Sequence, residues 1–356
     1  MTKGSTMARE ARITVGIDLG DKQSMVCVVD GNGDVLEEAR LATTSTAFQH
    51  RFASVAPARV VLEVGTHSPW VSRLLKECGH ETVVVDPRKL ELITQSDKKT
   101  DRHDASTLAL LGRIDTNLQL LKSVSHRPAQ FQADLSVIRS RDALVRARTL
   151  LINDVRGLVK SAGGRLPASS AEAFPKKALP HVPPPLLATL KVSLEQIASL
   201  SQSIRELDAQ VIEIAATRYP ETGALTQIPG VGTLTALTFV LTIADPQRFR
   251  RSRQIGAYLG LVPRLRQSGE RDPKLSITKA GDPYLRQILV SAAHYIIGPF
   301  GPDTDLRRFG LALAARGDKR RAVIAVARKL AVLLHHLWVT GEVYEPLRQK
   351  ELVPIA

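Results

Sequence analysis

The stretch Ile13-Thr-Val-Gly-Ile-Asp18 is an apolar run that ends on an acidic residue. Its β-branched residues predict a buried strand over 13–19. Two further strands are expected over 24–30 and 35–41, and the turn between them is Gly31-Asn-Gly-Asp34. These three segments predict strands that are linked by hairpin turns. Asp18 is expected near the end of the first strand, where the strand meets solvent.

Beyond the third strand the pattern alternates between helix and strand. Helices are expected over 45–55 and 69–78, and strands over 58–63 and 82–86. Three hairpin-linked strands followed by this alternation are the order of a ribonuclease H-like α/β fold. In that fold the first acid lies on the first strand and the second at the end of the fourth, where this chain has Glu63 after Val60-Val-Leu.

Two more acids follow in Lys99-Thr-Asp-Arg-His-Asp104. Asp101 and Asp104 are three residues apart, which places both on one face of the helix that continues from them. Each acid alone is open to a simpler reading, as a solvated loop residue or a helix cap. Together, four carboxylates from three segments indicate a site for two hard divalent cations, which can clamp the attacking and leaving oxygens of a phosphodiester.

The overall charge favours a polyanionic partner. The 356 residues carry a formal charge of +14 and a pI near 10.0. Residues 248–286 hold eight Arg and two Lys against three acids, a net of +7 in 39 residues. A dense basic segment interleaved with Gly, Pro and Tyr indicates phosphate contacts. Aromatic residues make up only 4% of the chain, so base stacking is not expected to dominate recognition.

Cysteine content and hydropathy predict a soluble, cytoplasmic protein. Cys27 and Cys78 both lie in apolar runs and offer neither a disulfide framework nor zinc-ligand spacing. The first ten residues lack the apolar core of a secretory signal. The apolar segment 322–339 is interrupted by Arg328, Lys329 and two histidines, so it is expected to be an amphipathic core helix and not a membrane span.

The middle of the chain predicts a helical hairpin. Residues 131–161 form one arm, Gly163-Gly164 and a Pro-rich stretch end it, and a return helix follows. The return helix repeats apolar residues as a heptad seam, and two readings stay open: packing against its own partner arm, or a coiled-coil contact in a dimer. Three domains are expected: 1–125, 126–220 and a mainly α-helical 221–356.

The C-terminal domain opens with Ile228-Pro-Gly-Val-Gly232 before a helical segment. This resembles the hairpin of helix-hairpin-helix DNA-binding modules. Gly230 and Gly232 would let backbone N–H groups at a helix N-terminus approach a phosphate.

Nearly the whole chain resembles the DEDD-type recombinases of the insertion-sequence-110 group, including its insertion-sequence-1111 branch. The matching motifs are Gly16-Ile-Asp18, Glu63 before Gly65-Thr66, Lys99-Thr-Asp-x-x-Asp-Ala105, Arg148-Thr149 with Asn153 and Arg156, Ile228-Pro-Gly-Val-Gly232, Gly260-Leu-Val-Pro263, Gln267-Ser-Gly269, Ile277-Thr-Lys-x-Gly281 and Ala325-Val-Ala-Arg-Lys-Leu330. One departure is Glu63-Val-Gly-Thr-His67, where family members often read Glu-Ala-Thr-Gly; the carboxylate itself is kept.

The resemblance implies roles for single residues. Asp18, Glu63, Asp101 and Asp104 become the metal ligands of a RuvC-like domain that binds two Mg²⁺ ions, with Mn²⁺ as the expected substitute, and Ser268 becomes the nucleophile. Nucleic-acid contacts are expected from Lys99, Arg102, Arg148, Arg156, Gly230, Gly232, Arg264, Arg266, Arg271, Lys274 and Lys279. The implied partners are donor and target DNA, a structured noncoding guide RNA encoded beside the gene, and further copies of the chain in a dimer or tetramer, at the bacterial nucleoid.

Two other functions fit parts of the same sequence. A Holliday-junction resolvase or another RuvC-like nuclease would use the four acids with water as nucleophile, leaving Ser268 as a loop hydroxyl. Gly16-Ile-Asp-Leu-Gly20 also resembles the first phosphate loop of actin-like sugar kinases and ATPases. No second phosphate loop of that kind follows in the sequence, and the basic C-terminal third would have no role in a kinase.

Overall fold

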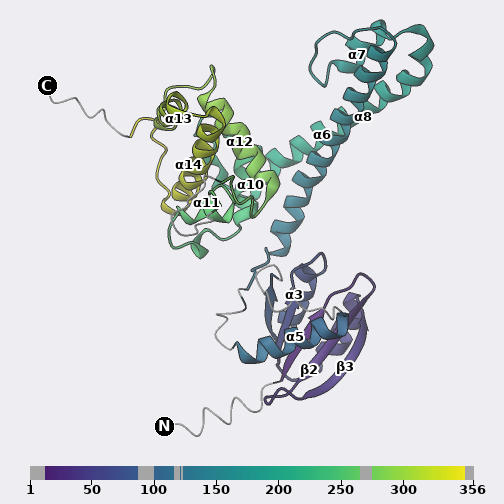
Figure 1. Ribbon diagram of the computed structural model, residues 1–356, viewed down its shortest axis with the longest axis vertical. Helices are drawn as coiled ribbons and strands as arrows, with labels where there is room; N and C mark the ends of the chain where they lie inside the picture. Colours follow the sequence, from purple (N-terminus) through teal and green to yellow (C-terminus); the bar gives the residue numbers. More distant parts are fainter. Residues whose placement is uncertain (1–12, 87–99, 116–120, 122, 265–274, 349–356) are drawn as a thin grey trace, which may run out of the picture. The chain divides into compact units, whose positions relative to one another are not determined.

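The computed structural model describes residues 13–86, 100–115, 121, 123–264 and 275–348. It divides into two compact units, Met1–Arg127 and Pro128–Ala356. The first unit is built around a β-sheet, and the second is helical in the part that the structure describes (Figure 1).

The sheet of the first unit has five strands in the order β3-β2-β1-β4-β5. The strands are β1 (Thr14–Asp18), β2 (Gln23–Val29), β3 (Val35–Ala42), β4 (Arg59–Glu63) and β5 (Glu81–Val85). β1, β2 and β3 pair antiparallel, whereas β4 pairs parallel with both β1 and β5. This is the hairpin-linked, then alternating, order that the sequence predicts, so the mixed α/β class of the N-terminal unit is confirmed.

Side-chain alternation gives the sheet two buried faces. Residues such as Ile17 and Leu62 face a core shared with α2 (Ser45–Phe52) and α3 (Ser68–Glu77), where Phe48 and Leu75 are buried. The opposite face is covered by α5 (Asp101–Ile114) (Figure 1). Helices on both faces explain why the central strands read as nearly continuous apolar runs.

The second unit begins with the expected helical hairpin. Its arms are α6 (Ala129–Ser161) and α8 (Pro184–Arg218), and its tip contains the short helices α7 (Phe174–Ala178) and η2 (Leu179–His181). Ile197, Ile204, Val211 and Ile214 of the heptad seam are buried within this unit. The seam therefore packs inside the hairpin and at its base, and a coiled coil between chains is not confirmed.

The base of the hairpin shares one core with the helices that follow it. Leu135 and Ile138 of α6 and Val211 of α8 belong to the same buried cluster as Phe239 and Leu330. The remaining elements are α9 (Thr222–Leu225), α10 (Thr233–Ile243), η3 (Pro246–Arg248), α11 (Gln254–Tyr258), α12 (Pro283–Ile297), α13 (Asp305–Arg316) and α14 (Lys319–Thr340). A buried polar group locks this base: Asp134 accepts a hydrogen bond of 2.8 Å from the Tyr219 hydroxyl and pairs with Arg218.

Helix α14 contains the apolar segment predicted as a core helix. By length and composition it passes as a membrane span, and half of its most apolar window is buried inside the protein. Val326, Leu330 and Leu334 are fully buried in the shared core with α10 and α12. Its apolar residues are therefore used in packing within this unit.

Candidate active site and nucleic-acid interface

Asp18 and Glu63 end two neighbouring parallel strands. β1 and β4 pair in register from Thr14↔Arg59 to Ile17↔Leu62, so the next residues along the two strands are the two acids. Asp18 follows Gly16 by two positions and Glu63 follows Val61 by two, which puts each acid on the face of the sheet that α5 covers. Both side chains are half-buried and both make polar contacts.

Glycine lets α5 lie directly on this face. A Cβ at Gly16 would lie 2.0 Å from the Ala105 carbonyl oxygen, and one at Gly112 would lie 2.3 Å from the Val61 side chain. Gly16 lies two residues before Asp18 and faces Ala105 near the start of α5, whereas Gly112, near the end of α5, faces Thr14 and Val61. The helix thus runs antiparallel to β1, and its N-terminus lies at the end of the strand that carries Asp18.

The two helical acids occupy that same end. Thr100 caps α5, and its side-chain oxygen accepts a hydrogen bond of 3.3 Å from the His103 N–H. Asp101 lies one turn before Ala105, which meets Gly16, and Asp104 lies one turn before the buried Leu108. Asp101 is exposed and Asp104 half-buried. The four predicted acids therefore lie on one face of the sheet and at one end of it.

The four carboxylates fit a hard divalent cation in donor type and in placement. Among the residues that the structure describes, however, no three His, Cys, Asp or Glu side chains gather into a group that could hold a metal ion. The fold thus brings the acids to a common edge, and the predicted convergence to metal-bridging distance is not seen in this arrangement of the side chains.

Arg102 stands beside this edge and is engaged within the first unit. Its guanidinium pairs with Glu38 of β3, and the hydrogen bond from Arg102 lowers the pKa of Glu38. The Arg102 side chain is still 71% exposed, so a phosphate can reach it only in competition with Glu38. Lys99, expected to act beside it, lies outside the described residues.

The segment that carries Ser268 begins and ends on paired backbone. Pro263 and Ile277 form an antiparallel bridge, the Arg264 N–H donates to the Ser276 carbonyl over 3.0 Å, and the Thr278 N–H donates to the Val262 carbonyl over 2.9 Å. Arg264 and Lys279 are both exposed at these paired arms. Ser268, Arg266, Arg271 and Lys274 lie outside the described residues.

Lys279 is held in an unusual backbone conformation. Its φ is +58°, in the left-handed region that costs a non-glycine residue energy. The neighbouring backbone supports it: the Lys279 N–H donates to the Gly260 carbonyl over 3.1 Å, and the Arg286 side chain donates to the Ala280 carbonyl over 2.7 Å. These contacts fix the exposed Lys279 at the end of the paired arms.

The glycine turn before α10 also has the expected form. Gly230 adopts a φ of +88°, and a Cβ there would lie 3.0 Å from the Tyr295 ring of α12. Gly232 is the exposed N-cap of α10. A shallow cavity of about 600 Å³ lies over this turn and α12. The N-terminal N–H groups of α10 are therefore placed where an anion can reach them.

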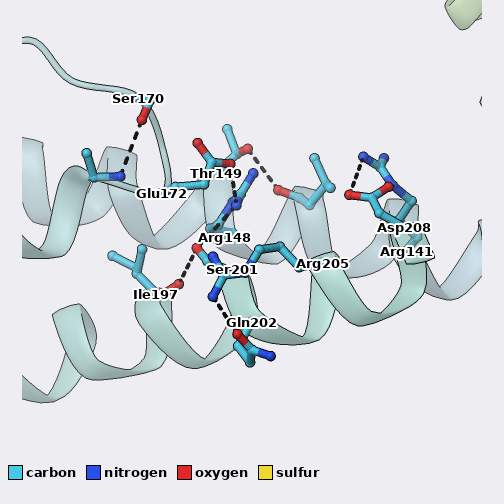
Figure 2. Close-up of polar contacts among 12 residues, drawn as sticks. Arg141, Arg148, Thr149, Ser170, Glu172, Ile197, Ser201, Gln202, Arg205 and Asp208 are labelled. Atoms are coloured by element: carbon cyan, nitrogen blue, oxygen red, sulfur yellow. Dashed lines mark hydrogen bonds and ion pairs between the residues drawn. The ribbon is translucent and has the colours of Figure 1, made fainter. Parts of the chain in front are cut away.

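Two arginines predicted to bind nucleic acid are used inside the hairpin instead. Arg148 is 8% exposed, and its guanidinium donates to Glu172 over 3.0 Å and to the Ser201 hydroxyl over 3.2 Å (Figure 2). Arg156 stacks on the Phe174 ring at 4.9 Å and is half-buried. These contacts hold the tip against the arms and leave both guanidiniums less available to a phosphate than the sequence predicts.

The fold gives Arg248, the first cation of the basic segment 248–286, a fixed position that the sequence does not predict. Its guanidinium lies 4.8 Å from the Phe249 ring centroid and 4.5 Å from that of Tyr258. Stacking on two rings holds an exposed cation in one orientation. In the sequence, the adjacent Phe249 could have suggested that Arg248 stacks on a ring. Tyr258 is ten residues away and becomes a neighbour of Arg248 only through the fold.

Two family models match most of the chain. A model for DEDD-type IS110 transposases, described as "Transposase", matches residues 15–163, and one described as "Transposase IS116/IS110/IS902 family" matches residues 223–305. The first match includes all four acids, and its DEDD class supports the use of a divalent metal.

Curated relatives agree with the two models over nearly their full lengths. The "Transposase for insertion sequence element IS1111A" of Coxiella burnetii is 28% identical, with 93% of this chain and 90% of the relative covered. The "Probable family 20 transposase" of Pseudomonas aeruginosa is also 28% identical, with 93% and 98% covered. A solved structure described as "Thermus thermophilus RuvC structure" matches with 16% identity and a TM-score of 0.23, over 29% of this chain and 97% of that one. The chain belongs to the IS110 family of insertion-sequence transposases.

Proposed function

We propose that this chain is a site-specific DNA recombinase that cuts and rejoins strands of donor and target DNA. The observation that carries this proposal is the placement of Asp18, Glu63, Asp101 and Asp104 on one face and at one end of the sheet, in a transposase chain. Four carboxylates at one end of a sheet serve little purpose in packing, because like charges that approach one another cost stability.

The four acids would hold two Mg²⁺ ions, and Mn²⁺ would substitute for them because it accepts the same oxygen ligands. When bound, the two ions would supply charge neutralisation to the phosphodiester and activation to a nearby hydroxyl. The chain's own part is to hold the acids on a rigid sheet and helix. Arg264 and Lys279, exposed at the paired arms beside the Ser268 segment, would orient the phosphate.

Ser268 would be the nucleophile. Its Oγ forms a bond to phosphorus while the bond from phosphorus to a deoxyribose oxygen breaks. The serine proton passes to a carboxylate or water, and the released deoxyribose oxygen takes up a proton. A hydroxyl from a second strand then attacks the phosphoserine and returns the proton to Ser268. The number of phosphodiester bonds is conserved, so no external energy source is needed.

The proposal extends to partners through family resemblance. An element-encoded noncoding RNA would pair with donor and target DNA and so select the sites, which suits a chain with a charge of +14. Because the acids and Ser268 belong to different units, a dimer or tetramer would allow the two to meet between chains. The reaction would take place in the cytoplasm, at the nucleoid.

The acid cluster is tested by cleavage of a duplex that carries the element ends, with and without Mg²⁺. Asp18→Asn, Glu63→Gln, Asp101→Asn and Asp104→Asn should each abolish Mg²⁺-dependent cleavage and leave the melting temperature unchanged or raised. Asp34→Asn is the matched control, since Asp34 is an exposed acid in a turn of the same unit. Cleavage that survives in the four variants would contradict the metal site.

A further inference from the structure

The tip of the hairpin is a small packed body of its own. Val155 and Val159 of α6, Phe174 of α7 and Leu190 and Ile197 of α8 form a buried cluster separate from the core at the hairpin base. Gly163, with a φ of +81°, ends α6 and starts the turn into the tip. The segment from Arg156 to Lys191 therefore presents a fixed surface and not a loose loop.

This surface is strongly basic. Residues 156–191 contain six Lys and Arg against one acid, Glu172, a net of +5 in 36 residues. Glu172 is already paired with the buried Arg148. The five exposed cations are Lys160, Arg165, Lys176, Lys177 and Lys191. Within the described part of the chain, none of these five side chains makes an ion pair, a hydrogen bond or a ring contact, so their charge faces solvent.

The tip, at α7, lies well away from α10, α11 and α12 of the same unit (Figure 1). Ile138 belongs to the core at the base and Val159 to the core of the tip, and both are on the continuous helix α6. The 21 residues between them span about 32 Å at 1.5 Å per residue. One turn of B-DNA is about 34 Å long, so base and tip are spaced to reach backbone positions about one turn apart.

From this charge and spacing we propose that the hairpin tip is a second DNA-binding surface, which holds the phosphate backbone of a duplex about one helical turn from the DNA held by the C-terminal helices. This inference rests on the proposed function only in taking DNA as the polyanion. It assigns the contacts to the free cations of the tip, and it leaves Arg148 and Arg156 to hold the tip together. Direct pairing of two tips is disfavoured, because each carries a net charge of +5.

The test compares two quadruple variants of the full chain that lose the same charge. The tip variant is Arg165→Gln, Lys176→Gln, Lys177→Gln and Lys191→Gln. The control variant is Arg316→Gln, Lys319→Gln, Arg320→Gln and Arg321→Gln, which are exposed cations at the turn between α13 and α14. Binding to a duplex of about 40 base pairs is measured without metal against salt concentration, so that the result does not depend on strand cleavage.

In the tip variant, the plot of log K against log salt should be less steep. The magnitude of its negative slope should fall by about 3 to 4, since each lost phosphate contact removes roughly 0.9. The duplex length at which affinity stops rising should also shorten by about ten base pairs. The control variant should change neither quantity. If one substitution set unfolds the chain, Lys176→Gln alone should lower the slope by about 1.

Three results would overturn the inference. The tip variant could bind duplex DNA with the wild-type slope. It could lose no more than the control variant, which would make the effect one of net charge alone. It could keep DNA binding and lose only the binding of a structured RNA hairpin of matched length, which would assign the tip to RNA.

Discussion

At the scale of single residues, Arg148 shows how position in a packing seam outweighs residue type. It lies seven residues before the buried Val155, and its neighbour Ser201 lies between the buried Ile197 and Ile204. Both therefore occupy seam positions where apolar residues are usual. The basic character of α6 predicts that Arg148 contacts a phosphate, whereas its place in the heptad pattern predicts that it is buried. The second prediction is the one that the structure bears out. The two signals conflict in the sequence, and only the fold decides between them.

We predict that Arg148→Met leaves the DNA affinity unchanged and costs little or no stability. Met fills similar space, Glu172 is 52% exposed and regains water, and Ser201 keeps its hydrogen bond of 2.8 Å to the Ile197 carbonyl. Glu172→Ala should be the more destabilising change, because it leaves a buried guanidinium without its counter-charge, and its Nε already lacks a partner in the described part of the chain. Thermal melting and DNA titration of both variants check this. Lost affinity at an unchanged melting temperature would restore a phosphate role for Arg148.

The pairing also has a pH dependence with a defined sign. Hydrogen bonding by the backbone N–H of Glu172, together with Arg148, lowers the pKa of that carboxyl. A depressed carboxylate pKa stabilises the fold above the unfolded pKa, and this contribution is lost as pH falls through the folded value. The stability of the wild-type chain relative to Arg148→Met should therefore decrease in acid, below about pH 4.

At the scale of elements, the contact of α5 with β1 positions the candidate active site. The strands of the first unit were predictable to within a residue or two, because the central strands are mostly buried and the strands end at clear turns. The approach of α5 was not predictable from those runs. The sequence places Gly16 in a strand and in two motifs, and none of these indicates that it lets the Ala105 backbone lie against the sheet. Nothing local to Gly16 names a partner almost 90 residues away.

We predict that Gly16→Ala destabilises the first unit by about 1–3 kcal/mol or more, because the new methyl group would overlap the backbone of α5 and force the helix away. Gly157→Ala is the matched control. Gly157 is exposed in α6, a Cβ there meets nothing within 4 Å, and the change should stabilise its helix by up to about 1 kcal/mol. Urea denaturation of both variants measures the difference. A Gly16→Ala chain as stable as the wild type would show that α5 does not pack as described.

At the scale of the whole molecule, the acids and Ser268 come from segments about 160 residues apart and from two different units. The sequence identifies both through motifs, and the fold supports the first by placing the acids at one edge. In the proposed mechanism, bringing the acids and Ser268 together would depend on bound DNA and metal, which a run of residues does not encode locally. For this reason the proposed role of Ser268 is best tested by asking whether a DNA strand becomes covalently attached to it.

The most direct measurement is mass spectrometry of the protein–DNA adduct formed with Mg²⁺ on a duplex that carries the element ends. We predict a phosphodiester-linked DNA strand on Ser268. Ser268→Ala should still bind DNA and metal but lose both the adduct and strand exchange, whereas Ser276→Ala at the neighbouring arm should retain both. Cleaved DNA with no adduct would instead indicate a nuclease that uses water. Strand exchange by Ser268→Ala at a rate near that of the wild type would contradict the mechanism proposed for this chain.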